Sequence, residues 1–295
     1  MIRLLILVGI CAVLPTAAAA QPLHIHADSY PVAYFTERIA GDLAEVTLPV
    51  PADRDPSHWS PPIPVIAAFQ AADLIVLNGA GLAQWTARAT LPRGKIVDSS
   101  AGFADRLIVT DGVTHSHGAE GEHSHTGTAS FTWLDFSLAG LQATAIAAAL
   151  ETRLPSDANV LSANLESLLA DLSALDAAAS ELLGPASACR FLAPQSRYQY
   201  FARRYGFDIE TIAWDPSMAL DPDQIAMIGA ALGASPVVML WEGDPVETAQ
   251  SVLSDRGFVG VAFDPAVHAP SDGDFVSTMA ANLARLGEVL EEAGC

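Results

Sequence analysis

The sequence predicts an α/β fold of two lobes, each with a mostly parallel sheet flanked by helices, joined by a long backbone helix. Three observations predict this arrangement. Short apolar runs typical of buried strands alternate with helical stretches in both halves of the chain. One helical pattern, over residues 156–183, separates the halves and is longer than any other element. The 295 residues also provide enough chain for two ordinary domains.

The elements of both lobes follow from hydrophobic periodicity. The expected strands are residues 23–27, 45–50, 73–78, 95–98, 107–110, 190–193, 209–214, 237–241 and 259–263. The expected helices are residues 32–43, 61–72, 135–153, 198–205, 221–232, 245–256 and 275–292. A ligand of such a fold is expected in the cleft between the lobes, beyond the carboxyl ends of the strands.

The long helix has start and stop signals at its ends. Pro155 interrupts the preceding helical pattern, Ser156 is a suitable N-cap, and Gly184-Pro185 ends the helix. We therefore expect four regions along the chain. These are a signal peptide over 1–20, an amino-terminal lobe over 21–154 with a histidine-rich loop at 114–126, the linking helix over 155–184, and a carboxyl-terminal lobe over 185–295.

The first 20 residues have the features of an export signal. Arg3 precedes an apolar run over 4–14, and Ala18-Ala19-Ala20 fits the A-x-A cleavage pattern before Gln21. The run is too short for a membrane span of about 20 residues. Ile10, just before Cys11, is too bulky for a good lipoprotein cleavage site. We expect a periplasmic protein with no direct membrane insertion.

The net charge excludes some classes of partner. The chain has 34 acidic against 14 basic residues, a formal charge of −20. Such a surface repels nucleic acid and anionic lipid and attracts cations.

Two cysteines remain after the signal, Cys189 and Cys295. In an oxidising compartment we expect them to form a disulfide, and two unpaired thiols are the alternative.

The strongest local signal for chemistry is a histidine-rich segment. His115, His117, His123 and His125 stand there as two H-x-H pairs, with two glutamates and several glycines interleaved. Imidazole and carboxylate groups bind Zn²⁺ and similar cations, and glycines allow the segment to wrap around an ion. We predict that these four histidines bind a transition metal. The alternative is a solvated polar linker.

Other residues are weaker candidates for metal ligands. His58 lies just before a helix, and a capping or packing role beside Trp59 competes with a ligand role. Asp264 follows a strand, where binding residues collect, although a turn Asp before Pro265 is the alternative. Glu242 also ends a strand, and we interpret it as a solvated loop carboxylate. The histidines less favoured as ligands are His24, His26 and His268.

The arrangement of these stretches resembles the cluster A-I solute-binding proteins, the periplasmic zinc- and manganese-binding components of metal ABC transporters. The resemblance rests on residues 55–59, 72–85 (ADLIVLNGAGLAQW), the histidine-rich loop, 132–135 (TWLD), 164–175, 200–206 (YFARRYG), Asp264-Pro265 and 274–286. It implies two lobes on a rigid backbone helix. It also implies an ABC permease as partner, with Zn²⁺ as the cargo and Mn²⁺ as a second possibility.

The resemblance also implies a four-ligand metal site between the lobes, from which this chain departs. Ser57 stands at the family's first histidine position, which shifts His58 by one residue. Phe131 and Gln195 stand at the second and third positions, and only Asp264 matches outright. Three explanations stay open: the loop histidines replace the lost ligands, the cleft binds another ligand, or the protein is an accessory metal carrier.

The function expected from the sequence is therefore capture of a metal cation, mainly zinc, for an ABC importer by a monomeric periplasmic protein. The alternatives are an accessory periplasmic metallochaperone and a solute-binding protein for a non-metal ligand. We expect no enzyme activity, because the sequence has no H-E-x-x-H, G-x-S-x-G or P-loop motif.

Overall fold

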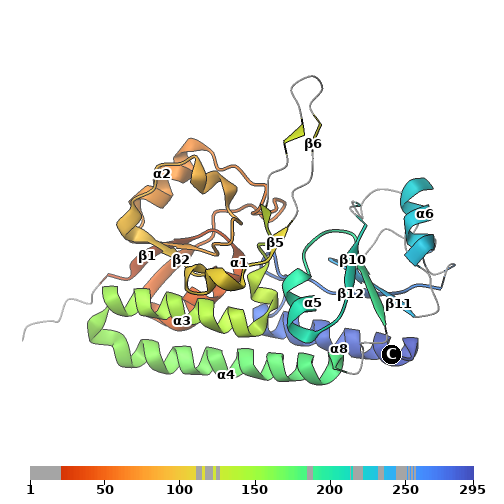
Figure 1. Ribbon diagram of the computed structural model, residues 1–295. Helices are drawn as coiled ribbons and strands as arrows, with labels where there is room; N and C mark the ends of the chain where they lie inside the picture. Colours follow the sequence, from red (N-terminus) through yellow and green to blue (C-terminus); the bar gives the residue numbers. More distant parts are fainter. Residues whose placement is uncertain are drawn as a thin grey trace, which may run out of the picture.

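The structure is a computed structural model with two four-stranded parallel sheets lying on a layer of long helices (Figure 1). It describes residues 21–110, 115–116, 122–123, 127–184, 189–212, 214, 222–231, 236–243, 251, 253, 255 and 257–295. The expected signal peptide lies outside this range. In the described part of the chain, the helices are all too short or too polar to cross a membrane.

The amino-terminal sheet has the order β2-β1-β3-β4, and every neighbouring pair is parallel. Its strands are β1 (Leu23–Ala27), β2 (Ala44–Thr47), β3 (Leu74–Leu77) and β4 (Ile96–Asp98). Successive side chains in a strand point to opposite faces. Leu74 and Val76 therefore join the main core, whereas Ile75 packs with Phe69 on the other face.

Two sets of helices cover the two faces of this sheet. The main-core face is covered by α1 (Tyr30–Ala40) and α3 (Phe136–Arg153). The other face is covered by α2 (Ile63–Ala71), through Phe69. The α3 helix begins where Asp135 accepts hydrogen bonds from the backbone amides of Ser137 and Leu138, a standard N-cap.

The carboxyl-terminal sheet repeats this plan with the order β10-β9-β11-β12. All its pairs are parallel, and its strands are β9 (Arg190–Ala193), β10 (Ile209–Thr211), β11 (Val237–Trp241) and β12 (Val259–Ala262). Its two faces also bury separate cores. Val238 and Leu240 belong to the main core, whereas Met239 packs with Ile228 of α6 (Pro222–Ala231).

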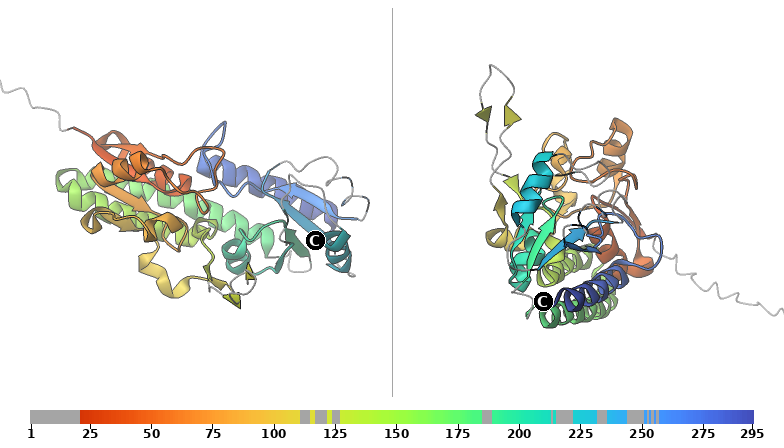
Figure 2. Two further views of the ribbon diagram at one scale, coloured as in Figure 1. Left: turned by 90° about the horizontal axis from the view of Figure 1, so that it is seen from above. Right: turned by 90° about the vertical axis from the view of Figure 1, so that its right-hand side faces the viewer.

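The two lobes share one helical support. The helix α4 (Ala158–Leu183) has 26 residues, a length of roughly 39 Å at 1.5 Å per residue. It contacts α1 and α3 of the first lobe and α5 (Gln199–Tyr205) and α8 (Phe275–Ala293) of the second. Figures 1 and 2 show α4 and α8 side by side beneath the sheets. The expected backbone helix and the two-lobed fold are confirmed.

Most differences from the expected elements are at their ends. The strand expected at 45–50 ends at Thr47, before Pro49, which has no amide hydrogen for a sheet. The segment expected at 107–110 contributes only β5 (Val109–Thr110), which pairs antiparallel with β8 (Gly127–Thr128) outside the parallel sheet. The helix expected at 245–256 lies almost entirely outside the described residues.

The expected disulfide is present. Cys189 and Cys295 are bonded, with their Cα atoms 5.7 Å apart and a sequence separation of 106. The bond ties Cys295, two residues after the end of α8, to Cys189, which directly precedes β9. The last helix is thereby fixed covalently to the carboxyl-terminal sheet.

Candidate functional site

The carboxyl ends of the amino-terminal strands carry a buried polar network. Asp28 follows β1, and its Oδ1 atom accepts hydrogen bonds from the Asn78 amide and the Ser29 hydroxyl, each at 2.9 Å. Burial raises the pKa of Asp28 to about 7, although the same hydrogen bonds oppose that rise. Gln142 of α3 closes the network by donating to the Asn78 side chain and to Ser99 Oγ, each at 2.9 Å. This network ties together the residues that follow β1, β3 and β4.

The cleft between the lobes contains a buried guanidinium group. Arg197, in the loop after β9, is 9% exposed. Its Nη2 atom lies 2.7 Å from Asp55 Oδ2 of the first lobe, and its Nε atom lies 2.6 Å from Glu242 Oε2 at the end of β11. Its Nη2 atom also donates to Gln195 Oε1 at 2.9 Å, and its Cζ atom lies 4.7 Å from the centre of the Phe131 ring. One side chain therefore bridges both lobes.

The charges in the cleft shift one another's pKa values. Burial raises the pKa of Asp55, but the Arg197 charge and the hydrogen bonds from Ser57 outweigh burial and hold it below its usual value. Burial raises the pKa of Glu242, and Arg197 only partly offsets this. The expectation that Glu242 is a solvated loop carboxylate is wrong, because its side chain is 20% exposed and paired with Arg197.

Asp264 lies beside this ion-pair cluster. Together with Asp55, Arg197, Glu242 and His268 it lines a cavity of about 280 Å³. Burial raises the pKa of Asp264, and the hydrogen bond that its Oδ1 atom accepts from the Ala266 amide at 2.8 Å opposes the rise. Asn282 of α8 holds the backbone of Asp264 on both sides, accepting from its amide at 3.1 Å and donating to its carbonyl at 2.6 Å.

His58 lies on the other side of Asp55. Its side chain is 81% exposed, and its Nδ1 atom lies 2.9 Å from Ser57 Oγ and 3.8 Å from Asp55 Oδ2. It lines a second cavity, of about 290 Å³, together with Trp59 and Trp85. The two predicted ligands on the lobes, His58 and Asp264, therefore face different cavities.

The remaining histidines outside the loop are spread over the molecule. His24 is exposed, with Nδ1 3.4 Å from Glu45 Oε2. His26 packs edge-on against Phe69, with ring centres 5.1 Å apart, and burial lowers its pKa, as does the neighbouring His24. Only His268 lines the cavity that contains Asp264.

The described residues of the histidine-rich loop form two short paired strands. The strands β6 (His115–Ser116) and β7 (Glu122–His123) are antiparallel, and their register places His115 opposite His123. They stand away from both sheets (Figures 1 and 2). His117 and His125 lie outside the described residues. Within the described residues, no group of three or more His, Cys, Asp or Glu side chains is arranged to hold a metal ion.

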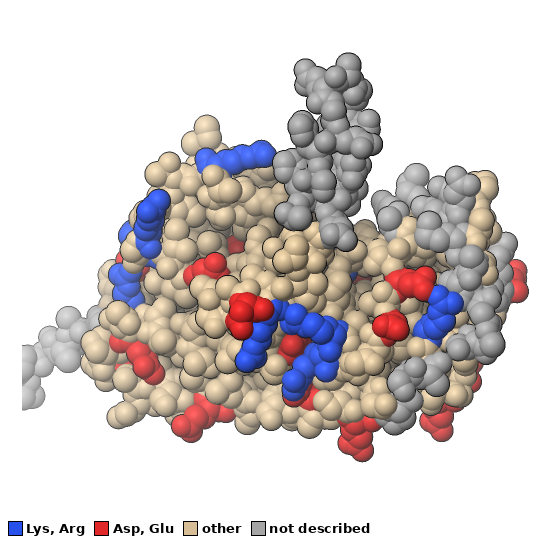
Figure 3. Space-filling view, in the orientation of Figure 1, with Lys and Arg blue, Asp and Glu red and all other residues tan. Residues whose placement is uncertain are grey.

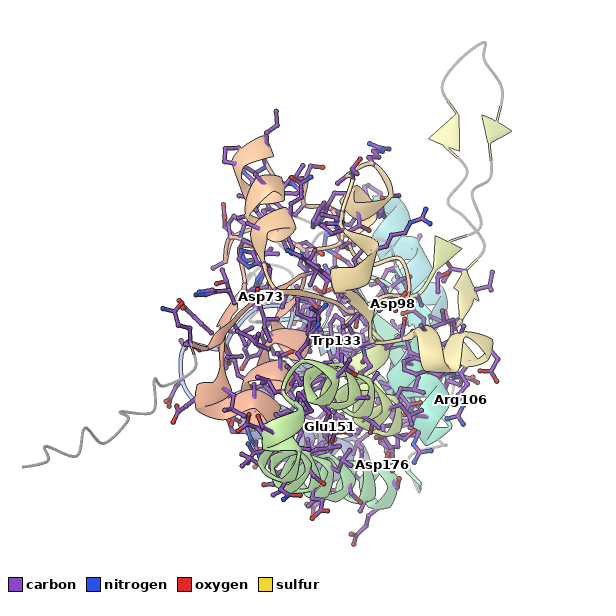
Figure 4. All side chains as sticks on the ribbon, turned by 90° about the vertical axis from the view of Figure 1, so that its left-hand side faces the viewer. Asp73, Asp98, Arg106, Trp133, Glu151 and Asp176 are labelled. Atoms are coloured by element: carbon purple, nitrogen blue, oxygen red, sulfur yellow. A yellow bond between two sulfur atoms is a disulfide. The ribbon has the colours of Figure 1, made fainter. Side chains whose placement is uncertain are left out.

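Two side chains form hydrogen bonds across the boundary between the lobes. Trp133, from the TWLD stretch of the first lobe, is fully buried (Figure 4) and donates from Nε1 to the carbonyl of Pro265 at 2.7 Å. Tyr200 of the second lobe donates to the carbonyl of Ala129 at 3.0 Å. On the described part of the face in Figure 3, basic and acidic side chains lie side by side, so the acidic excess of the whole chain is not evident on this face.

Comparison with known proteins identifies the family. Residues 25–289 match the model for ZnuA, the periplasmic component A of the zinc-uptake complex. The chain belongs to the ZnuA family. This match confirms the resemblance that the sequence motifs indicated.

Named relatives of this family bind metals. The zinc-binding lipoprotein AdcA of Streptococcus pneumoniae is 29% identical over 213 residues, which are 68% of this chain and 42% of AdcA. The manganese ABC transporter substrate-binding lipoprotein PsaA of Streptococcus anginosus is 24% identical over 94% of this chain and 92% of its own length. The chain thus spans less than half of AdcA.

A solved structure of similar fold is that of the metal-dependent lipoprotein YcdH from Bacillus subtilis. It superposes with a TM-score of 0.76 at 21% identity, covering 90% of this chain and 98% of YcdH. At this identity the similarity concerns the fold, and it agrees with the two-lobed α/β architecture described above.

Sequence reasoning missed the central residues of the cleft. The sequence does not mark Asp55 or Arg197 as functional, and it favours a solvated loop carboxylate for Glu242. One signal was available. Arg197 is one of only 14 basic residues in an acidic chain, and it stands two residues after Gln195, at a position where the resemblance implies a ligand.

Proposed function

We propose that this member of the ZnuA family is a metal-binding solute-binding protein of an ABC importer, with Zn²⁺ as its cargo. It captures the ion outside the cytoplasmic membrane and delivers it, as a monomer, to a membrane permease. The family match over residues 25–289 and the zinc-binding relative AdcA support this proposal. The relative PsaA supports Mn²⁺ as a second cargo. Ligand exchange, with no bond-making chemistry, is the task.

The observation that carries the location of the metal is the uneven distribution of its potential ligands. The segment 115–125 contains four histidines and two glutamates within eleven positions. In the described parts of the two lobes, by contrast, no comparable cluster is formed, and an arginine pairs with the two cleft carboxylates of Asp55 and Glu242. We therefore assign capture of the ion to His115, His117, His123 and His125, with His58 and Asp264 as candidate additional ligands.

A zinc titration tests this assignment. The mature protein is titrated in competition with a chromogenic chelator, beside a full-length variant in which the four loop histidines are changed to serine. A second variant, His24→Ser, controls for loss of an exposed imidazole outside the two cavities. We expect the loop variant to lose at least tenfold in affinity and the control to bind as the parent does. Equal affinity of parent and loop variant contradicts the assignment.

The arginine in the cleft also favours a second candidate, an accessory periplasmic metallochaperone that hands zinc to another carrier. The two functions differ in their dependence on a permease. A solute-binding protein stimulates ATP hydrolysis by its permease in proteoliposomes when zinc-loaded, whereas an accessory carrier only transfers zinc to a second binding protein. For either function we expect no turnover of esters or phosphates with zinc present.

A further inference from the structure

Arg197 has the surroundings of a bound cation. Its guanidinium contacts two carboxylates, from Asp55 and Glu242, and one amide oxygen, from Gln195. The Phe131 ring covers one side, at a distance that permits a cation–π interaction. Planar guanidinium groups suit such multiple contacts because their donors are fixed in a fork. The cleft therefore already contains a positive charge in a shell of acceptors.

The residues around this charge are the same ones that depart from the family pattern. Phe131 and Gln195, at two of the family ligand positions, touch the guanidinium directly. Ser57, at a third, donates through its amide at 2.8 Å and its hydroxyl at 2.5 Å to Asp55 Oδ1, which orients the carboxylate toward Arg197. The three residues that depart from the family pattern therefore either contact Arg197 or orient its carboxylate partner. Three substitutions that act on one side chain are expected when they have a common cause.

The bridge also joins the lobes. Asp55 and Phe131 belong to the first lobe, whereas Arg197, Gln195 and Glu242 belong to the second. The guanidinium therefore makes contacts across the boundary that a metal ion with ligands from both lobes would make. It is covalently part of the chain and does not leave.

We propose that Arg197 is the specificity-determining residue of the interlobe cleft: it acts as a built-in cation that takes the place of a divalent metal and holds the lobes together without cargo. A divalent ion placed between Asp55 and Glu242 would be repelled by the guanidinium and would have to displace it from both carboxylates. The cleft thus excludes the metals for which the family is named. This inference concerns the cleft alone and does not depend on where the loop binds its ion.

Metal binding by the cleft is measured in the full-length variant with the four loop histidines changed to serine. With Arg197 present, we expect no stoichiometric binding of zinc or manganese in equilibrium dialysis. Binding of one equivalent that is lost on Asp55→Asn or Asp264→Asn overturns the proposal. Binding that survives both changes places the ion outside the cleft and outside the loop histidines. That result counts against the loop assignment, and it agrees with the proposal that the cleft excludes divalent metals.

The bridging role is measured by hydrogen exchange in the metal-free protein, in peptides covering residues 129–135 and 262–268. These peptides contain both ends of the Trp133–Pro265 hydrogen bond between the lobes. We expect exchange to be at least fivefold faster in Arg197→Met, and faster to a smaller degree in Asp55→Asn, which leaves the Arg197–Glu242 pair intact. Arg190→Met, which removes a guanidinium paired with Glu210 within the second lobe, is the control. Equal rates in all three variants and the parent overturn the proposal.

Discussion

Asp55 and Arg197 form an ion pair of 2.7 Å across the boundary between the two lobes. Asp55 comes from the loop before α2 and Arg197 from the loop before α5, and their sequence separation is 142. Because Arg197 also pairs with Glu242, the cleft is organised around a positive charge that belongs to the chain.

Removing this charge should destabilise the protein. Arg197→Met leaves two carboxylates partly buried without their cation, and breaking a buried ion pair in this way costs about 3–5 kcal/mol. Asp55 and Glu242 are about one-fifth exposed, so we expect a loss of about 3 kcal/mol in the free energy of unfolding measured in urea. The control Arg190→Met removes an exposed pair and should cost less than about 1 kcal/mol. Equal losses for the two variants would show that the cleft ion pair contributes no more to stability than an exposed pair.

Asp28 should make stability fall as pH rises through the mildly acidic range. Its pKa is raised to about 7 in the folded protein from an ordinary value of 3.8, so the folded state holds a proton that the unfolded state has released. The contribution is therefore fully present below about pH 4 and is lost as the pH rises to about 7. Asp28→Asn keeps the acceptor oxygen for Asn78 and Ser29 and removes the titration.

The test for Asp28 is the difference between urea unfolding free energies of parent and Asp28→Asn at pH 5 and pH 7.5. The difference isolates Asp28 from the other titrating carboxylates. We expect the variant to gain stability relative to the parent at the higher pH. A difference that does not change with pH contradicts the assigned titration.

The disulfide should contribute strongly to the stability of the carboxyl-terminal lobe. Cys189 and Cys295 close a loop with a separation of 106 residues, for which the chain-entropy model gives about 4–5 kcal/mol. The double change Cys189→Ser with Cys295→Ser should lower the free energy of unfolding by about 2–5 kcal/mol. Dithiothreitol should do the same to the parent and nothing to the double variant. Equal unfolding free energies of the oxidised parent and the double variant would show that the bond adds nothing to stability.

Zinc affinity should fall steeply with pH if imidazoles hold the ion. Ordinary histidines have a pKa near 6.5, and only the neutral ring binds metal. Below that pH each imidazole ligand costs about tenfold in affinity per pH unit, so a site with two or more histidines should lose at least about 100-fold between pH 7.5 and 5.5. Isothermal titration at the two values, with buffer ionisation matched, measures this loss. A change below about threefold would point to carboxylate ligands.

The fold could be predicted from the sequence because its elements are strongly periodic. The strand at 237–241 and the long helix ending at Leu183 bury apolar residues at regular spacing, and both agree with the structure to within two residues. The antiparallel pairing of β5 with β8 depends on contacts across the histidine-rich segment, which local pattern does not contain.

The cleft could not be predicted in the same way. The sequence shows that Ser57, Phe131 and Gln195 are unsuitable as metal ligands, but it does not show what they contact. Arg197 reaches Asp55 only because the two lobes fold against each other on α4. A charge pair between residues so distant in sequence leaves no periodic signal, and Glu242 was misjudged for the same reason.

X-ray absorption at the zinc edge of the protein loaded with one equivalent of metal tests the central claim most directly. A loop site predicts a first shell that includes nitrogen at about 2.0–2.1 Å, with the multiple-scattering pattern of at least two imidazoles. The four-histidine-to-serine variant should lose that pattern. A shell made of carboxylate oxygen alone, unchanged in the variant, would contradict the assignment of the metal to the histidine-rich loop.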